Sequence, residues 1–148
     1  QYRFKGNDVM EKWFGSSGVC INDKGKVLMV LQGKPEEKKA WAVPSGGREL
    51  GESDEACCIR EVEEETGYKV RIIKELYLKK GYYEKINIYY EVRYYLVEII
   101  GGNQKIQDPD GLIHDIAWMS AEQVKTLNLS FPEDRDFIID YITKYAPK

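Results

Sequence analysis

The feature that most constrains the fold is a single helical segment set among stretches rich in β-forming residues. Residues 53–66 have helical periodicity, with Ser53 as a candidate N-cap and acidic residues in the first turn. Gly67 suits the C-terminal cap. Two segments rich in Val, Ile and Tyr follow, at 68–80 and 85–100, and they predict long strands. The chain therefore has to pack one helix against a sheet.

The remaining segments add more strands and two further helices. Residues 13–32 are typical of a hairpin whose turn contains Asp23 and Gly25, and a short strand at 41–43 ends at Pro44. An irregular glycine-rich loop is expected at 45–52. After the two long strands, the sequence predicts a strand at 112–120, a short helix at 121–127 and a helix at 130–145. The last helix opens with the Ser130-to-Glu133 spacing of a capping box. This order predicts a mixed α/β or α+β fold, with residues 1–148 forming a single domain.

Composition excludes several classes of protein. A chain of 148 residues that is 43% hydrophobic and 32% charged can form an ordinary globular core, and it has no apolar run long enough to span a membrane. A net charge of -3 gives no support for binding duplex DNA. Residues 1–15 lack the apolar segment of a secretory signal. The three cysteines form no CxxC pair, so we expect reduced core thiols in a cytoplasmic protein and no zinc site.

Acidic residues are concentrated between Pro44 and Tyr68, where eight of 25 residues are Asp or Glu. Residues three or four apart share one face of a helix, so Glu61, Glu64 and Glu65 should lie together. Ile59, Val62 and Cys58 point largely toward another side, where they can pack on a sheet. A glutamate-rich face can simply be solvated. It can also hold divalent cations, because Mg²⁺ prefers oxygen ligands, and the glycine-rich loop before the helix lets backbone atoms approach an ion or a phosphate.

The spacing of this segment favours the second reading, since it resembles the Nudix box of the MutT-like Nudix hydrolases. That box is G, five residues, E, seven residues, REU, one residue, EE, one residue, GU, where U is a bulky apolar residue. The box is complete over residues 46–68, with these residues in register: Gly46, Glu52, Arg60, Glu61, Val62, Glu64, Glu65, Gly67 and Tyr68. The resemblance implies a Nudix α/β/α sandwich, with a mixed β-sheet between the box helix and a C-terminal helix.

The same resemblance implies which residues hold the metal. The expected ligands of Mg²⁺ or Mn²⁺ are Glu61, Glu64 and Glu65, helped by the backbone carbonyl of Ser45 or Gly46. Members of the family differ in their general base, and Glu64 is the candidate here if it does not bind metal.

Three further residues have supporting roles by the same resemblance. Arg60 is expected to orient the glutamates rather than to contact phosphate, because an arginine can pair with a carboxylate through two hydrogen bonds. Glu52 is either an additional metal ligand or a residue that holds the metal ligands in position without contacting the metal itself. Glu49 is expected to form a local salt bridge.

The resemblance implies hydrolysis of a diphosphate linkage in a nucleoside diphosphate joined to another group. A nucleoside triphosphate, including oxidised ones, is the expected substrate, because the proline that follows the box in many ADP-ribose pyrophosphatases is absent and the first one is Pro109. The alternatives are an RNA 5′-end pyrophosphohydrolase, for which the basic residues among 79–85 would help, and a nucleotide-sensing Nudix-like module without catalysis. An isopentenyl-diphosphate isomerase has weaker support.

Other polar and aromatic residues outside the box have two readings each. His114 is either structural or catalytic, and Asp108 and Asp110 are typical of turns. The three tryptophans, Trp13, Trp41 and Trp118, are expected in the core or on a sheet face rather than stacked on a nucleobase. Four tyrosines near one hairpin either pack the strands or stack on a base: Tyr82, Tyr83, Tyr89 and Tyr90. The tyrosine-rich strands also offer surface for a homodimer.

Overall fold

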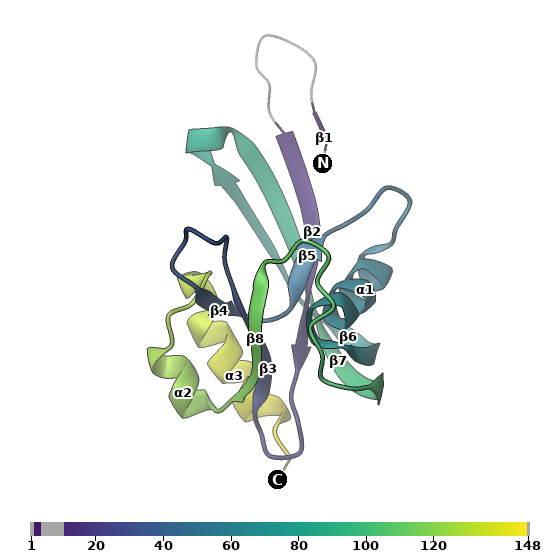
Figure 1. Ribbon diagram of the computed structural model, residues 1–148, viewed down its shortest axis with the longest axis vertical. Helices are drawn as coiled ribbons and strands as arrows, with labels where there is room; N and C mark the ends of the chain where they lie inside the picture. Colours follow the sequence, from purple (N-terminus) through teal and green to yellow (C-terminus); the bar gives the residue numbers. More distant parts are fainter. Residues whose placement is uncertain (1, 4–10, 148) are drawn as a thin grey trace.

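The computed structural model describes residues 2–3 and 11–147, and in this part of the chain two β-sheets lie between helices (Figure 1). Residues 1, 4–10 and 148 lie outside the described residues. Residues 1 and 4–10 make up most of residues 1–15, the segment in which the sequence indicates no secretory signal. The strands are β1 Tyr2–Arg3, β2 Glu11–Cys20, β3 Val27–Gln32, β4 Ala40–Ala42, β5 Ser45–Gly47, β6 Tyr68–Tyr83, β7 Ile88–Gly102 and β8 Ile113–Met119. The helices are α1 Asp54–Thr66, α2 Ala121–Thr126 and α3 Arg135–Tyr145, with the short 3₁₀ turns η1 Glu84–Ile86 and η2 Pro132–Asp134.

The larger sheet is mixed, as the sequence predicts. Its order is β1-β2-β7-β6, and β5 also pairs with β2. Strands β2 and β7 run parallel from the Glu11–Ile88 pair to the Cys20–Val97 pair, whereas the other pairings are antiparallel. A smaller antiparallel sheet has the order β4-β3-β8. The two long strands predicted after the helix are confirmed as β6 and β7.

The hairpin predicted over residues 13–32 is wrong in its pairing. The turn is present, since Asn22 accepts hydrogen bonds from the backbone of Lys24 and Lys26 through its side chain. The strands on either side meet only at the Ile21–Val27 bridge and then separate, β2 into the large sheet and β3 into the small one. Residues 15–20 and 27–30 are continuous buried runs, which are typical of strands covered on both faces. Such a run contains no information about which partner each strand takes.

Two other local expectations are corrected. The glycine-rich loop contains a strand, because Ser45–Gly47 pairs with residues 15–17 of β2. The capping box expected at Ser130 is not formed, since the Ser130 hydroxyl accepts a hydrogen bond from the Gln32 amide at 3.2 Å and α3 begins only after η2. The predicted caps of α1 are confirmed, with Ser53 accepting from the Ala56 amide and Gly67 in the left-handed conformation.

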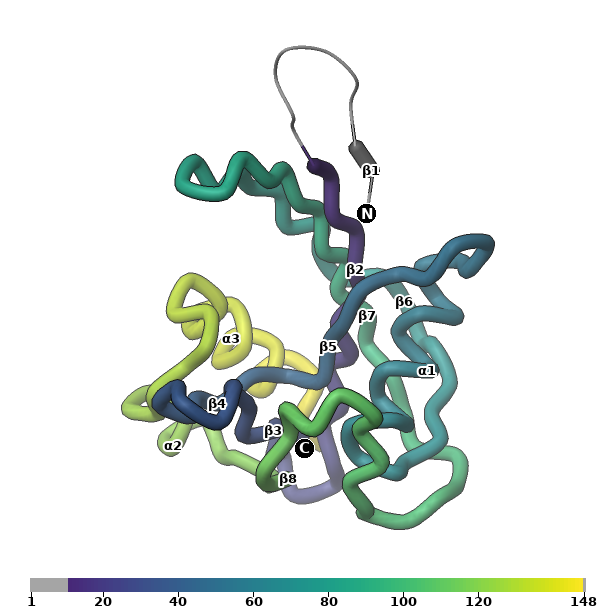
Figure 2. Tube along the Cα trace, turned by 45° about the horizontal axis from the view of Figure 1, so that its top comes forward, coloured from purple at the N-terminus to yellow at the C-terminus, as the bar shows by residue number. Residues whose placement is uncertain are grey.

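The layers follow from the alternation of buried residues along the strands. Tyr95 and Val97 of β7 pack in one cluster with Cys58 and Val62 of α1. Tyr94, their neighbour on the opposite face, packs in a second cluster together with Val19 of β2 and with Ile138 and Ile142 of α3. Figure 2 shows α1 on one side of the sheets and α2 and α3 on the other. The mixed α+β sandwich is therefore confirmed.

The three thiols lie in the core, as expected. Cys20, Cys57 and Cys58 are free and at most 3% exposed. Burial raises the pKa of Cys57 to about 11 and that of Cys20 to about 12, so both stay protonated near neutral pH. Among the described residues, no helix is long and apolar enough to cross a membrane.

A buried ionic cluster joins β6 and β7 to the start of α3. The Lys79 ammonium donates to Asp134 Oδ1 and to Glu133 Oε2, each at 3.1 Å, and the Tyr94 hydroxyl donates to Asp134 Oδ2 at 2.5 Å. Burial alone would lower the pKa of Lys79, but the contacts with Tyr94, Asp134 and Glu133 outweigh it and raise that pKa. Lys79 is therefore a buried cation with both anionic partners supplied by η2.

We expect Asp134→Ala to lower the free energy of unfolding by about 3 kcal/mol, because it removes a partner of a buried charge and of a buried hydroxyl. Urea unfolding measures the change. Asp140→Ala on the exposed face of α3 is the matched control and should change stability by less than about 0.5 kcal/mol. Equal stability of the two variants would contradict a structural role for the cluster.

Candidate active site

The candidate site lies where α1 passes over strand β5. The Glu61 carboxylate sits directly on the backbone of Gly46: a Cβ built there would be 2.1 Å from Glu61 Cδ. Only glycine leaves room for this approach, which explains why the box position in β5 has no side chain. The helix and the strand together therefore fix one carboxylate against the backbone.

Arg60 is the centre of the polar contacts in this region. Its Nε and Nη2 donate to the two oxygens of Glu52, at 2.7 and 2.8 Å. Its Nη1 donates to Glu61 Oε1 at 2.7 Å and to Glu64 Oε2 at 3.3 Å. Nη2 also reaches the Gly47 carbonyl oxygen at 2.9 Å. The pairing with Glu52 raises the pKa of Arg60 and lowers that of Glu52, so the guanidinium and the carboxylate both stay charged.

Glu61 and Glu65 form a carboxyl pair in which Glu65 is buried and Glu61 is partly buried. Glu65 is only 6% exposed, and its Oε1 accepts the backbone N–H of Ser45 at 3.2 Å. Burial raises the pKa of both carboxyls, and the charge of Glu61 and the more distant charge of Asp108 raise that of Glu65 further. Two desolvated carboxyls in contact hold either a proton or a cation. This pair is the feature that distinguishes the cluster from an ordinary solvated glutamate face.

The donor set suits a hard divalent ion. Three carboxylates and the Gly46 carbonyl offer only oxygen, and two of the carboxylates are already desolvated and in contact. Within residues 11–147, no three acidic, histidine or cysteine side chains surround one point closely enough to hold an ion as they stand. Arg60 accounts for this, since it draws Glu61 and Glu64 toward its own Nη1.

The structure brings together the residues that the box singles out. Ser45 and Gly46 lie in β5, Glu52 in the loop before α1, and Arg60 and the three glutamates on α1 itself. Glu49 also approaches Arg60, with its Oε1 at 3.6 Å from Nε, so the predicted local salt bridge is present. Cys57 faces the same region, and its thiol lies 3.5 Å from the Gly46 carbonyl oxygen.

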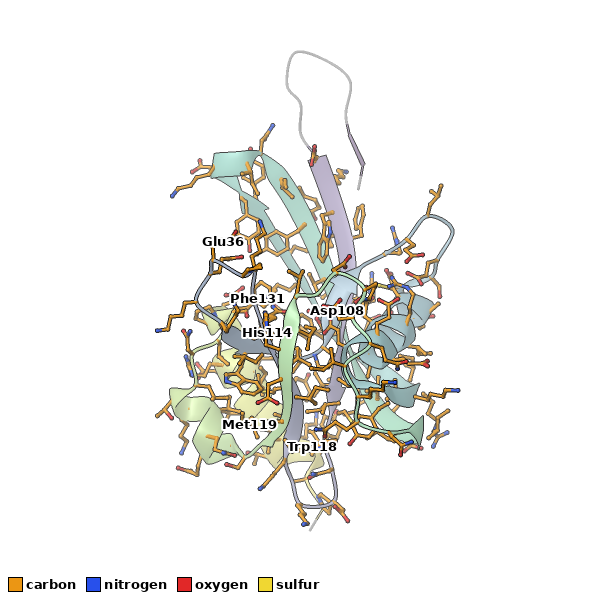
Figure 3. The ribbon with its side chains drawn as sticks, viewed as in Figure 1. Glu36, Asp108, His114, Trp118, Met119 and Phe131 are labelled. Atoms are coloured by element: carbon orange, nitrogen blue, oxygen red, sulfur yellow. The ribbon has the colours of Figure 1, made fainter. Side chains whose placement is uncertain are left out.

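His114 and Asp108, both labelled in Figure 3, have contacts typical of structural residues. The His114 ring Nε2 lies 2.9 Å from the Gly33 carbonyl oxygen, which ties β8 to the loop after β3. The Asp108 carboxylate accepts backbone N–H groups of Asp110, Leu112 and Ile113. The turn chemistry predicted for Asp108 is confirmed.

The loop at 103–112 also holds the end of α1, which the sequence did not indicate. The backbone N–H of Lys105 donates to the Thr66 carbonyl at 2.7 Å, and that of Gln107 donates to the Glu64 carbonyl at 2.9 Å. These bonds satisfy carbonyls that the end of a helix leaves without partners. No local signal marks this contact, because it joins segments about 40 residues apart.

An apolar cavity of about 270 Å³ lies beside the carboxylates and shares Ser45 with them. Its walls come from β2, β6 and β7 and from Phe131 in the segment before η2. Tyr83 and Tyr90 line it and stack on each other with ring centroids 4.9 Å apart. The other two of the four tyrosines considered from sequence, Tyr82 and Tyr89, are not among the lining residues. They pair with each other across β6 and β7, and as the neighbours of Tyr83 and Tyr90 they face the opposite side of the sheet.

Sequence reasoning missed the cavity residues that lie outside the tyrosine-rich hairpin. Trp13 is partly buried against the core, as expected, but it also forms a wall of the cavity. Lys79 was counted in a basic segment over 79–85, yet it is 7% exposed and paired with Glu133 and Asp134. That segment is therefore less basic than its sequence indicates.

We expect Gly46→Ala to weaken binding of Mn²⁺ by about 10-fold or more, because the new methyl group displaces the Glu61 carboxylate. Titration calorimetry with MnCl₂ measures the affinity. Gly101→Ala is the control, since a Cβ there meets only Lys69 Cβ, at 4.0 Å. Equal Mn²⁺ affinity in both variants would show that Glu61 is not a ligand.

Comparison with known proteins gives relatives along most of the chain. The ADP-ribose pyrophosphatase of Bacillus subtilis (strain 168) is 39% identical over 72 residues, which are 46% of this chain and 39% of that protein. Nudix hydrolase 5 of Arabidopsis thaliana is 29% identical over 115 residues, which are 74% of this chain and 36% of that protein. The chain thus spans less than half the length of these curated relatives.

Solved structures agree in fold. A NUDIX hydrolase from Nitrosomonas europaea superposes with a TM-score of 0.79 at 21% identity, and the match covers 92% of each chain. A family model described as the NUDIX domain matches residues 14–141, which is most of the sequence and includes β5, α1 and the cavity walls other than Trp13. On these grounds the chain belongs to the Nudix hydrolase family.

Proposed function

We propose that the chain hydrolyses a diphosphate linkage in a nucleoside diphosphate joined to another group, with Mg²⁺ or Mn²⁺ as cofactor. The observation that carries the proposal is the Glu61–Glu65 carboxyl pair, held on the Gly46 backbone and next to an apolar cavity. The pair suits a cation, and the cavity suits an apolar part of a substrate whose phosphates lie at that cation.

Four groups would hold the ion: the carboxylates of Glu61, Glu64 and Glu65, and the carbonyl of Gly46 or of the adjacent Ser45. A divalent ion bound there supplies charge for the phosphate oxygens and lowers the pKa of a coordinated water. Glu61 and Glu64 would have to turn from Arg60, which keeps its two hydrogen bonds to Glu52. Arg60 then limits the rotamers of the ligands and offsets the repulsion among them.

The remaining roles follow from these contacts. Glu52 anchors Arg60 from the loop before α1, which supports a positioning role for both residues. Glu64 is the candidate for the general base if it does not bind the ion, because its side chain is about one-third exposed and its carboxylate can accept a proton from water. Glu65 is too buried for that exchange, and we assign it to the metal.

A nucleoside triphosphate, oxidised ones included, is the substrate we propose. ADP-ribose is kept as a second candidate, because one of the relatives is named as an ADP-ribose pyrophosphatase. The three buried free thiols are in keeping with a reducing compartment, which supports the cytoplasm as the location. A homodimer remains a prediction.

The proposal is tested by following phosphate and pyrophosphate release from a panel of nucleoside triphosphates, ADP-ribose and a 5′-triphosphorylated oligonucleotide. We expect turnover of the free nucleotides with Mg²⁺ or Mn²⁺ and none after addition of EDTA. Nucleotide binding without release of phosphate under any of these conditions would instead indicate a sensing module.

We expect Glu65→Gln to reduce metal-dependent turnover by about 100-fold or more, because the amide cannot neutralise a divalent ion. The fold should survive, since the change removes a buried charge next to Glu61. Steady-state kinetics and urea unfolding on the same samples separate the two effects. Glu63→Gln is the control and should keep near wild-type rate, because Glu63 lies two residues from each member of the pair and so on another side of α1. Near wild-type turnover in Glu65→Gln would exclude it as a ligand.

A further inference from the structure

The residues that line the apolar cavity beside the carboxylates indicate which part of a substrate it can bind. Ser45 belongs both to the cavity and to the carboxylate site. It lines the cavity, and its backbone N–H donates to Glu65 Oε1. A substrate with its phosphate at the carboxylates would therefore place the attached group next to Ser45, at the edge of the cavity. The inference rests on the proposed function in this respect, since it concerns the part of the substrate beyond the phosphates.

Trp13 provides a rigid flat wall. Its indole lies against two glycines: a Cβ added at Gly15 would be 2.4 Å from the Trp13 ring, and one at Gly47 would be 3.0 Å from its Nε1. Gly47 belongs to the same strand as Ser45, so the ring is seated on the backbone that borders the carboxylates. An indole fixed in this way offers a stacking surface at little entropic cost.

The charged group in the cavity wall is already committed. Lys79 is the one charged residue among those that line the cavity in the described part of the chain, and its ammonium donates to Asp134 and Glu133. It also lies 4.6 Å from the centroid of the Phe131 ring. Two of the three N–H groups of this ammonium are therefore committed to carboxylates that balance its charge.

Among the tyrosines of the cavity wall, Tyr94 also has its hydroxyl committed to a hydrogen bond within the protein. The Tyr94 hydroxyl donates to Asp134, and the Tyr90 hydroxyl lies over Gly81, where a Cβ would be 2.2 Å from it. The hydroxyls of Ser17, Ser45 and Tyr83 remain in the walls, and a hydroxyl can serve as donor or as acceptor. Such groups do not distinguish one hydrogen-bonding edge from another.

We propose that this cavity selects an aromatic ring by stacking and shape and does not read its hydrogen-bonding edge. The specificity-determining side chains are Trp13 and Phe131, the second of which is labelled in Figure 3. An apolar pocket discriminates between similar groups by only about 10- to 200-fold, whereas paired polar groups reach far larger ratios. The chain is therefore a base-tolerant hydrolase, and it treats an oxidised guanine much as it treats guanine.

The test compares kcat/KM for ATP, GTP, CTP, UTP, dGTP and 8-oxo-dGTP with that for inorganic tripolyphosphate, which has no ring. We expect the nucleotides to agree within about 10-fold. We expect tripolyphosphate to be at least about 10-fold poorer, because it lacks the stacking contact. A preference above about 100-fold for one base, or for the oxidised base, would overturn the proposal.

Variants identify the residues. Trp13→Leu and Phe131→Leu should each raise KM about 10-fold for every nucleotide, leave kcat nearly unchanged and leave tripolyphosphate unaffected. Trp13→Phe should restore most of the affinity, which a purely structural defect would not allow. Tyr82→Leu, on the opposite face of the same hairpin, is the control. An equal loss for nucleotides and tripolyphosphate would overturn the assignment.

The two proposals fail in different ways. Absence of hydrolysis for every compound would overturn the proposed function, and the cavity would then be tested by calorimetry with AMP, GMP, CMP and UMP. Similar dissociation constants that all weaken in Trp13→Leu would support base-tolerant stacking. No binding, or binding of one nucleotide alone, would overturn it. Hydrolysis with a strict base preference would overturn only the inference on the cavity.

Discussion

The contact on which the site depends is that between the Glu61 carboxylate and the bare backbone of Gly46. It brings α1 onto β5 so closely that Glu65 loses most of its contact with water and Glu61 loses part of it, and the charge of Glu61 raises the pKa of Glu65 further. Arg60 makes this arrangement tolerable by pairing with Glu61 on one side and with Glu52 on the other. The helix is therefore held in a state that favours the uptake of positive charge.

The carboxylates and the cavity are structurally linked because β5 borders both. Ser45 contacts Glu65, and Gly47 supports the Trp13 indole and accepts a hydrogen bond from Arg60. If the proposed function holds, this three-residue strand sets the separation between the phosphates and the ring of a substrate. The Lys79 cluster lies in another part of the cavity wall, where it fixes η2 and balances the charge of the lysine.

Most of the local structure could be predicted from the sequence, and the errors share one cause. The caps of α1 and the long strands β6 and β7 were predicted because they depend on neighbouring residues. The pairing of residues 13–32 was wrong, and β5 was taken for loop, because strand pairing is decided by distant segments. Ser130 has the spacing of a cap, but its hydroxyl has a better partner in Gln32, which is 98 residues away.

The sequence by itself determined the identity of the chemistry-bearing groups, because the spacing of Arg60, Glu61, Glu64 and Glu65 places them on one side of a single helix. Only the tertiary structure decided how they behave. Burial of Glu65 depends on β5, and the cavity is assembled from Trp13, Lys79 and Phe131, which lie on three distant segments. Contacts between such segments leave no local pattern, since each residue also fits an ordinary place in a strand or loop. Desolvation and shape complementarity arise only when the sheets and helices pack together.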